Sequence, residues 1–168
     1  QGGKFIKIDK DSALGFFRKW SKSENYHVRR LASEGLRPRL PWGVVLSEFK
    51  KSPLDILPIL EGLKNDESEY VRRSVANNLN DISKDNPQLV IELLGRWSGD
   101  AVKENLIKHA LRTLLKKGDR ESLRLVGVDS NILSENFTIQ TFALQKAVVN
   151  IYGDLIFDFS LRNQASKN

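Results

Sequence analysis

The sequence predicts a mainly α-helical protein, an α-solenoid of antiparallel helix pairs followed by a short C-terminal β-hairpin. Three observations support this prediction. Helix signals fill residues 9–134, a helical segment recurs at intervals near 40 residues, and the apolar pattern changes from helical to alternating after Asn136. We therefore expect a solenoid over residues 1–134 and a hairpin over residues 135–168.

Capping residues and glycines divide the first part of the chain into helices. Ser52-Pro53 and Asn86-Pro87 each place an N-cap residue before a proline that suits the first helical turn. Gly35 and Gly118 follow apolar-periodic stretches, as helix-ending glycines do. The helices expected from these signals are 11–20, 24–36, 43–51, 53–64, 67–83, 87–97, 101–117 and 119–126.

A repeated segment indicates how these helices are organised. The segment VRRLASEGL at 28–36 aligns without gaps to VRRSVANNL at 71–79, which begins 43 residues later. A weaker third copy, IKHALRTLL at 107–115, follows after 36 residues. Two-helix units at such a spacing are typical of a HEAT-like α-solenoid, in which each unit buries its apolar face against its neighbours.

The second copy of the repeat is amphipathic. One face carries apolar residues at helical spacing, namely Val71, Val75, Leu79 and Ile82. The opposite face carries the polar residues Arg73, Asn77 and Asn80. We therefore expect the first face in the core and the second on the surface.

The C-terminal segment has the pattern of β-structure. Leu155, Phe157, Phe159 and Leu161 alternate with residues of mixed polarity, which predicts a half-buried strand. Residues 147–151 are β-prone, and Tyr152-Gly153-Asp154 suits a turn, so the two segments are expected to pair as a hairpin. An isolated hairpin is marginally stable in water, so we expect its apolar face to pack on another surface.

Composition excludes several classes of protein and site. The chain of 168 residues contains no cysteine, which excludes disulfides and thiolate metal sites, and its two histidines are too few for an ordinary zinc site without carboxylate ligands. No apolar run approaches the ~20 residues of a transmembrane helix. The formal net charge of +6 suits a polyanionic partner. The chain begins at Gln1 and contains no methionine, so we expect it to be part of a longer protein.

The repeat alignment places polar residues in columns. If equivalent positions line the same side of successive units, the columns form a basic stripe along a groove. The columns are Arg30, Arg73 and His109; Glu34, Asn77 and Thr113; and Arg29, Arg72 and Lys108. A solvated helix face is the alternative interpretation of the same pattern.

Glu34 is the exception within this stripe, because a carboxylate repels phosphate. Two interpretations remain open on the residues alone: an ion pair with Arg30, four residues earlier, or an interaction with a cationic ligand. The segment that follows presents Arg37, Arg39 and Trp42 between two prolines. Trp42 could belong to the core or could stack on a base or a cation.

Three motifs together resemble the bacterial HEAT-like repeat DNA glycosylases, in particular their AlkC-type branch. The motifs are HVRRLASEGLRPRLPW at 27–42, YVRRSVANNLNDI at 70–82 and HALRTLLKKG at 109–118. The resemblance implies an enzyme that excises cationic N-alkylated bases such as 3-methyladenine from double-stranded DNA. It also implies that the hairpin is the start of an immunoglobulin-like domain.

The resemblance gives the polar residues their expected roles. Glu34 would stabilise the oxocarbenium character of the sugar, Trp42 would contact the lesion or its sugar, and Arg30 would orient Glu34 or hold a phosphate. Contacts with the DNA are expected from Arg29, Arg37, Arg39, Arg72, Arg73, Asn77, Lys108, Arg112 and Lys116. Neither a cofactor nor a metal ion is expected, and no obligate protein partner. Such an enzyme is expected in the cytoplasm, associated with the nucleoid.

Two other functions remain possible on these residues. A non-catalytic HEAT-like module could bind DNA or a protein partner through the same stripe, although a scaffold has no need for both Glu34 and Trp42. A nuclease would need clustered carboxylates for metal ions, and Asp81 and Asp85 have no evident third ligand.

Overall fold

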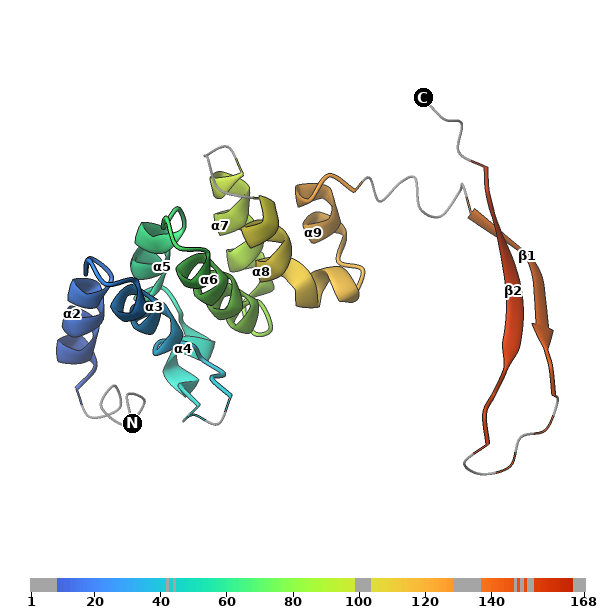
Figure 1. The fold of residues 1–168 in the computed structure, drawn as a ribbon, viewed down its shortest axis with the longest axis horizontal. Helices are drawn as coiled ribbons and strands as arrows, with labels where there is room; N and C mark the ends of the chain where they lie inside the picture. Colours follow the sequence, from blue (N-terminus) through green and yellow to red (C-terminus); the bar gives the residue numbers. More distant parts are fainter. Residues whose placement is uncertain are drawn as a thin grey trace. The chain divides into compact units, whose positions relative to one another are not determined.

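The computed structural model describes residues 9–41, 43, 45–98, 104–128, 137–146, 148, 150 and 153–164. It divides into two units, Gln1–Gly127 and Val128–Asn168. The described part of the first unit is helical, and that of the second is a two-stranded antiparallel sheet (Figure 1). The predicted fold class, a mainly α protein with a C-terminal hairpin, is therefore confirmed.

The described residues of the first unit form eight helices, which stack one after another along the unit (Figure 1). They are α2 Lys10–Trp20, α3 Tyr26–Glu34, α4 Ser47–Lys51, α5 Leu57–Leu63, α6 Glu69–Ile82, α7 Pro87–Trp97, α8 Glu104–Lys116 and α9 Arg120–Leu125. Each predicted helix is present, although several are shorter than expected. The largest difference is α5, which begins at Leu57 because residues 54–56 form a turn closed by the bond from Ile56 N to Pro53 O.

The two glycines predicted to end helices do so in different ways. Gly118 follows α8 with a φ of +71°, a left-handed conformation that favours glycine. Gly35 follows α3 with a φ of −67°, so its backbone does not require glycine. Its role is steric, because a Cβ atom at Gly35 would lie 2.8 Å from Cε1 of Phe17 on α2. Close packing of α2 on the end of α3 therefore depends on this glycine.

Helix α6 lies between α3 and α8 (Figure 1) and has the most buried residues of the three. Its apolar residues Val71, Val75, Leu79 and Ile82 are fully buried, as their spacing predicts. Burying one such side chain stabilises the fold by about 1.5–3 kcal/mol. This face of α6 is therefore a major stabilising element of the unit.

Polar residues of α6 also contact its neighbours. Asn78 Nδ2 donates to the Ser33 carbonyl of α3 at 2.8 Å. Asn80 Oδ1 accepts from the backbone N and from Oγ1 of Thr113 on α8, at 3.2 and 2.9 Å. The prediction that Asn80 faces outward is wrong, since it is 1% exposed. A helix packed on two sides keeps only a narrow polar edge, and Asn80 lies outside that edge.

The second unit contains β1 Phe137–Leu144 and β2 Phe157–Asn163, which pair antiparallel with Phe142 opposite Phe159. The prediction of β2 is confirmed, but the prediction that residues 147–151 pair with it is wrong, because β1 does so; residues 147, 149 and 151 lie outside the described residues. Strand β1 offers β2 a partner of matching length, and Gln145 N extends the ladder by donating to Ile156 O at 3.0 Å. Both strands are exposed along their length instead of half-buried.

The predicted domain boundary and the predicted immunoglobulin-like domain stay predictions. The predicted boundary after residue 134 falls within residues 129–136, which lie outside the described residues, and the immunoglobulin-like domain stays a prediction. Among the helices that the structure describes, none has the length and apolar character needed to cross a membrane.

Candidate functional site

The predicted columns meet at a pocket between α3 and α6, which we call the first pocket. Its volume is about 270 Å³. The residues lining it are Arg30, Glu34, Tyr70, Arg73, Ser74 and Asn77. Four predicted site residues thus lie together although 43 residues separate the two copies of the repeat. This proximity follows from the packing of α3 on α6.

Glu34 is held in place by two hydrogen bonds and an ion pair, from residues of two helices and the following loop. Its Oε1 accepts from Nη1 of Arg37 at 2.7 Å, and its Oε2 accepts from Ser74 Oγ at 3.1 Å. Nη2 of Arg30 lies 3.5 Å from Oε2, the ion pair expected from their spacing. The Glu34 side chain is 14% exposed, so the carboxylate lies at the pocket wall with restricted freedom.

Arg37 connects this carboxylate to a second one. Its Nε donates to Oδ2 of Asp81 at 2.8 Å, and Lys84 Nζ lies 3.0 Å from Oδ1 of the same group. Burial alone would lower the pKa of Arg37, but its hydrogen bonds to Asp81 and Glu34 outweigh burial and raise it. The guanidinium therefore stays charged and fixes the end of α3 against the end of α6.

Three more of the predicted DNA contacts also have partners inside the protein. Arg39 forms a two-point contact with Asp85, at 3.1 and 2.8 Å. Arg29 does the same with Asp66, at 2.6 and 3.0 Å, and is 11% exposed. Arg72 donates to the backbone carbonyls of residues 66 and 67 and is buried. Arg29 and Arg39 join successive repeats, and Arg72 holds the turn that precedes its own helix, so the geometry of all three favours a structural role.

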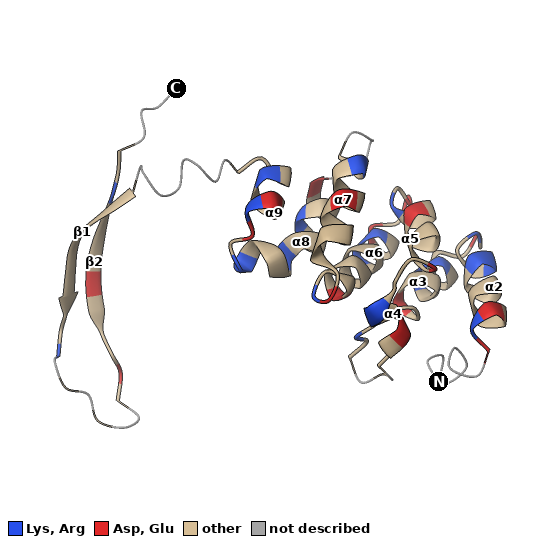
Figure 2. Ribbon diagram, turned by 180° about the vertical axis from the view of Figure 1, so that it is seen from behind, with Lys and Arg blue, Asp and Glu red and all other residues tan. Residues whose placement is uncertain are grey.

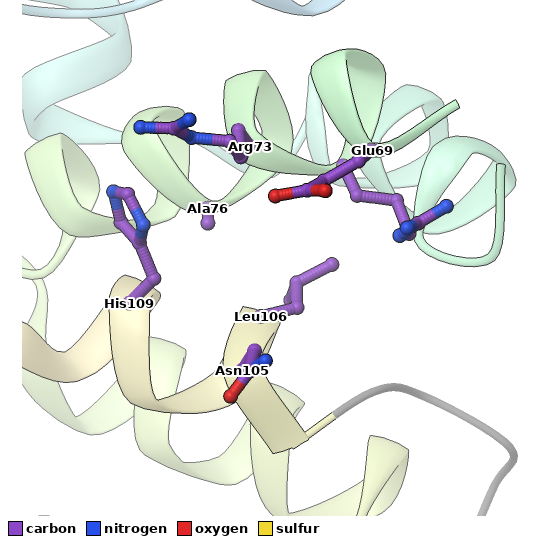
Figure 3. Close-up of a pocket in the computed structure, with 7 residues that line it drawn as sticks. Glu69, Arg73, Ala76, Asn105, Leu106 and His109 are labelled. Atoms are coloured by element: carbon purple, nitrogen blue, oxygen red, sulfur yellow. The ribbon is translucent and has the colours of Figure 1, made fainter. Parts of the chain in front are cut away.

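A second pocket, of about 350 Å³, lies between α6 and α8. We call it the second pocket, and its lining residues are Glu69, Arg72, Arg73, Ala76, Asn105, Leu106 and His109. Figure 3 shows Arg73 and His109 together on one side of the cavity, with the Glu69 carboxylate reaching into it from α6. Arg73 lines both pockets and thereby connects them.

His109 occupies a polar but partly desolvated position. Its Nε2 lies 2.9 Å from Oδ1 of Asn77, within hydrogen-bond distance. Burial lowers the pKa of His109, and the positive charges of Arg112 and Arg73 lower it further. The neutral ring is therefore favoured near neutral pH, and His109 extends the polar surface without adding charge.

The remaining predicted contacts lie on α6 and α8. Arg73, Lys108 and Lys116 are exposed, and Lys108 Nζ lies 3.4 Å from Glu104 Oε2. Arg112 is half-buried and donates to the His109 carbonyl at 2.9 Å. Basic and acidic residues are interspersed over the helices (Figure 2). Two carboxylates, Glu34 and Glu69, line the pockets beside Arg30 and Arg73, so the predicted stripe is not purely basic.

Trp42 and Tyr70 differ from the other residues considered for the site. Trp42 lies outside the described residues, and its catalytic role stays a prediction. Tyr70 lines the first pocket and was missed as a candidate, although it directly precedes Val71 in the second motif. A residue one position before a buried face lies at the edge of that face, which is the signal that could have identified it. Among the described residues, no group of acidic and histidine side chains could hold a metal ion.

Comparison with known proteins gives matches over most of the chain. The model of a family described as "DNA alkylation repair enzyme" matches residues 2–116. The uncharacterized protein YhaZ of Bacillus subtilis is 44% identical over 160 residues, covering 95% of this chain and 44% of that protein.

A solved structure gives a similar result. It is the Pseudomonas fluorescens alkylpurine DNA glycosylase AlkC bound to DNA containing an abasic site analog, which is 39% identical with a TM-score of 0.84. The match covers 96% of this chain and 45% of that chain. The chain thus spans less than half the length of both relatives.

Proposed function

Because this chain belongs to the family of DNA alkylation repair enzymes, we propose that it forms the lesion-facing part of a DNA glycosylase. The substrate is duplex DNA with a cationic N-alkylated base of the 3-methyladenine type. The observation that carries the proposal is the Glu34 carboxylate, which lines a pocket together with Arg30 and Arg73. The similarity to AlkC, a glycosylase seen with DNA containing an abasic site analog, supports the same type of ligand.

The proposed reaction needs little acid catalysis. A purine alkylated at N3 or N7 carries a positive charge. The glycosidic bond between N9 of this base and C1′ of the sugar therefore breaks with its electron pair going to the base. The base leaves neutral, and positive charge develops on the sugar. Glu34 stabilises that charge, and water then adds to C1′ and loses a proton.

The donors around Glu34 position it for this role. Arg37 and Ser74 each hold one carboxylate oxygen, at 2.7 and 3.1 Å, so little reorganisation is needed as charge develops. Preorganised groups of this kind contribute more than mobile ones, because their orientation is already fixed before the reaction. Arg37 and Ser74 are therefore positioning residues, and Glu34 is the catalytic residue.

The duplex is proposed to lie across α3, α6 and α8. Arg73, Lys108 and Lys116 are exposed and are assigned to phosphates, with Arg112 and Asn77 at the edge of the same surface. Contacts of this kind position DNA without reading its sequence. Arg29, Arg39 and Arg72 are assigned to the structure of the repeats instead, because their guanidiniums bind groups of the protein.

The test is base release from N-methylated duplex DNA by the intact protein that contains these residues. We expect release of 3-methyladenine, and a rate at least about 10²-fold lower for Glu34→Gln, the loss typical of a preorganised transition-state stabiliser. Glu24→Gln, the same change at an exposed position before α3, serves as the control and should leave the rate unchanged.

Two outcomes would contradict the proposal. Duplex binding without release of any alkylated base would indicate a non-catalytic DNA-binding module. Release at equal rates by the wild type and Glu34→Gln would remove Glu34 from catalysis.

A further inference from the structure

The second pocket, between α6 and α8, has a cationic side. Arg73 and His109 lie together there, and Glu69 reaches into the cavity from the opposite side (Figure 3). Arg72 also lines the pocket, but its guanidinium binds backbone carbonyls. Arg73 is exposed and forms no ion pair with any residue that the structure describes. An exposed guanidinium without a carboxylate partner is available to bind an anion from outside the protein.

The contact with Asn77 determines which nitrogen of the His109 ring carries the proton. Asn77 Oδ1 can only accept a hydrogen bond, and it lies 2.9 Å from Nε2 of His109, so Nε2 is the donor of the neutral ring. Among the described residues, none forms a hydrogen bond with the other ring nitrogen, Nδ1. A second proton would therefore bind to Nδ1 and turn this nitrogen into a hydrogen-bond donor.

Neighbouring charges oppose that second proton in the free protein. Burial lowers the pKa of His109, and the charges of Arg112 on α8 and Arg73 on α6 lower it further. Arg112 is itself influenced by Asp81, which favours its charge, and by Arg37, which opposes it. A phosphate beside Arg73 would offset the positive charge that acts on the ring, so protonation of His109 would then become favourable.

The repeat alignment places permanent cations at the equivalent positions of the two preceding units. Arg30, Arg73 and His109 form one column of the alignment. The two arginines are charged at every physiological pH, whereas the histidine is charged only when it is protonated. The third unit is therefore the one whose charge responds to what binds beside it.

We propose that the second pocket binds one phosphate group of the DNA backbone between Arg73 and His109, and that His109 takes up a proton at Nδ1 when this phosphate binds. The inference deepens the proposed function: it rests on the duplex lying across α6 and α8, and not on the chemistry at Glu34. The proton comes from the solvent, so the complex holds one proton more than the separate partners. By linkage, the affinity for duplex DNA then rises as the pH falls.

The experiment measures binding of an undamaged duplex to the intact protein, so that no lesion contributes. Dissociation constants are determined at pH 6, 7 and 8 and at one ionic strength, because salt alone changes the affinity. The proteins compared are the wild type, His109→Asn, His109→Arg, Arg73→Gln and His27→Asn. His27, exposed on α3, is the other histidine of this chain and provides the matched control.

We expect the wild type to bind about tenfold more tightly at pH 6 than at pH 8, a coupling of ordinary size between two ligands. His109→Asn should lose this pH dependence and bind at pH 8 nearly as the wild type does. His109→Arg should bind tightly at all three pH values, and His27→Asn should behave as the wild type. Arg73→Gln should lower both the affinity and its pH dependence, because the phosphate loses its permanent cation. A merely structural role of His109 would instead lower the affinity of His109→Asn equally at every pH.

Three results would overturn the inference: equal wild-type affinities at pH 6 and pH 8, an unchanged pH dependence in His109→Asn with an unchanged circular dichroism spectrum, or an unchanged pH dependence in Arg73→Gln. Failure of the duplex to bind at any pH would overturn both the inference and the proposed function. Binding that depends on pH and on His109, without release of any alkylated base, would support the inference and contradict the proposed function alone.

Discussion

Arg37 and Arg39 provide a sharp test of the energetics, because both are arginines of one loop that pair with aspartates of α6 or the turn after it. Arg37 is 8% exposed and binds Asp81, itself 2% exposed, and Glu34. Arg37→Met leaves both carboxylates without their central partner. Breaking a buried ion pair costs about 3–5 kcal/mol. We expect a loss of stability at the lower limit, about 3 kcal/mol. In the variant, Lys84 still contacts Asp81 and Ser74 still donates to Glu34.

Arg39→Met is the matched control. The Arg39 and Asp85 side chains are 37% and 24% exposed, so water screens their attraction and the expected loss is at most about 1 kcal/mol. At about 2–4 °C per kcal/mol for a chain of this size, Arg37→Met should lower the Tm by about 6–12 °C and Arg39→Met by no more than about 4 °C.

The assay is thermal and urea unfolding followed by far-UV circular dichroism, at low and high salt. The loss in Arg39→Met should shrink further in salt, whereas that in Arg37→Met should persist, because a buried pair is poorly screened. Equal losses in the two variants would show that burial of the Arg37 network is not the stabilising factor described here.

Three further predictions concern the DNA surface, the packing of α3 and the effect of pH. Arg73→Gln should weaken binding to any duplex and make the slope of log K against log salt concentration shallower by about 0.9, the value of one phosphate contact. The control Arg96→Gln on α7 should leave this slope unchanged. Equal slopes for both variants would place Arg73 away from phosphate. Gly35→Ala should lower the free energy of unfolding in urea by about 1–3 kcal/mol, since its Cβ would lie 2.8 Å from an aromatic carbon of α2. The control Gly62→Ala should not destabilise the protein, because nothing lies within 4 Å of a Cβ atom at that position. Because the folded-state pKa of His109 is lowered, the stability that this residue contributes is complete above about pH 6.5 and falls as the pH drops below that value. His109→Asn should flatten the stability profile below about pH 6.5. An unchanged profile would contradict the lowered pKa of His109.

The helices and the pocket could be predicted from sequence because both depend on a local period. The aligned repeats place Arg30 and Glu34 beside Arg73 and Asn77, and the structure brings all four to one pocket. A repeat alignment is enough for this result, because neighbouring units stack their equivalent helices side by side.

The partners of the arginines could not be predicted from the period of a single helix. Arg37 pairs with Asp81 and Arg39 with Asp85, at separations of 44 and 46 residues. These separations are close to the length of one repeat, so acid–base pairs one repeat apart are the signal that would have distinguished structural arginines from DNA-binding ones.

The first strand of the hairpin was missed for a different reason. A strand is stabilised by the partner that it pairs with. Residues 147–151 directly precede the predicted turn at 152–154, whereas residues 137–144 do not, so the pattern favours the nearer segment as the partner. The observed connection is longer than the predicted three-residue turn, since Gln145 and Ile156 are still joined by a ladder hydrogen bond. Pattern alone identifies strand residues well but pairs them poorly when the turn is long.

The most direct measurement of the central claim, that Glu34 faces positive charge on the sugar, compares two stable sugar analogues in duplex DNA. One is a protonated pyrrolidine that resembles the oxocarbenium ion, and the other is neutral tetrahydrofuran of the same size. The intact wild-type protein should bind the pyrrolidine duplex at least about tenfold more tightly, and Glu34→Gln should abolish that preference while binding the tetrahydrofuran duplex as before. A preference that survives in Glu34→Gln would contradict the claim.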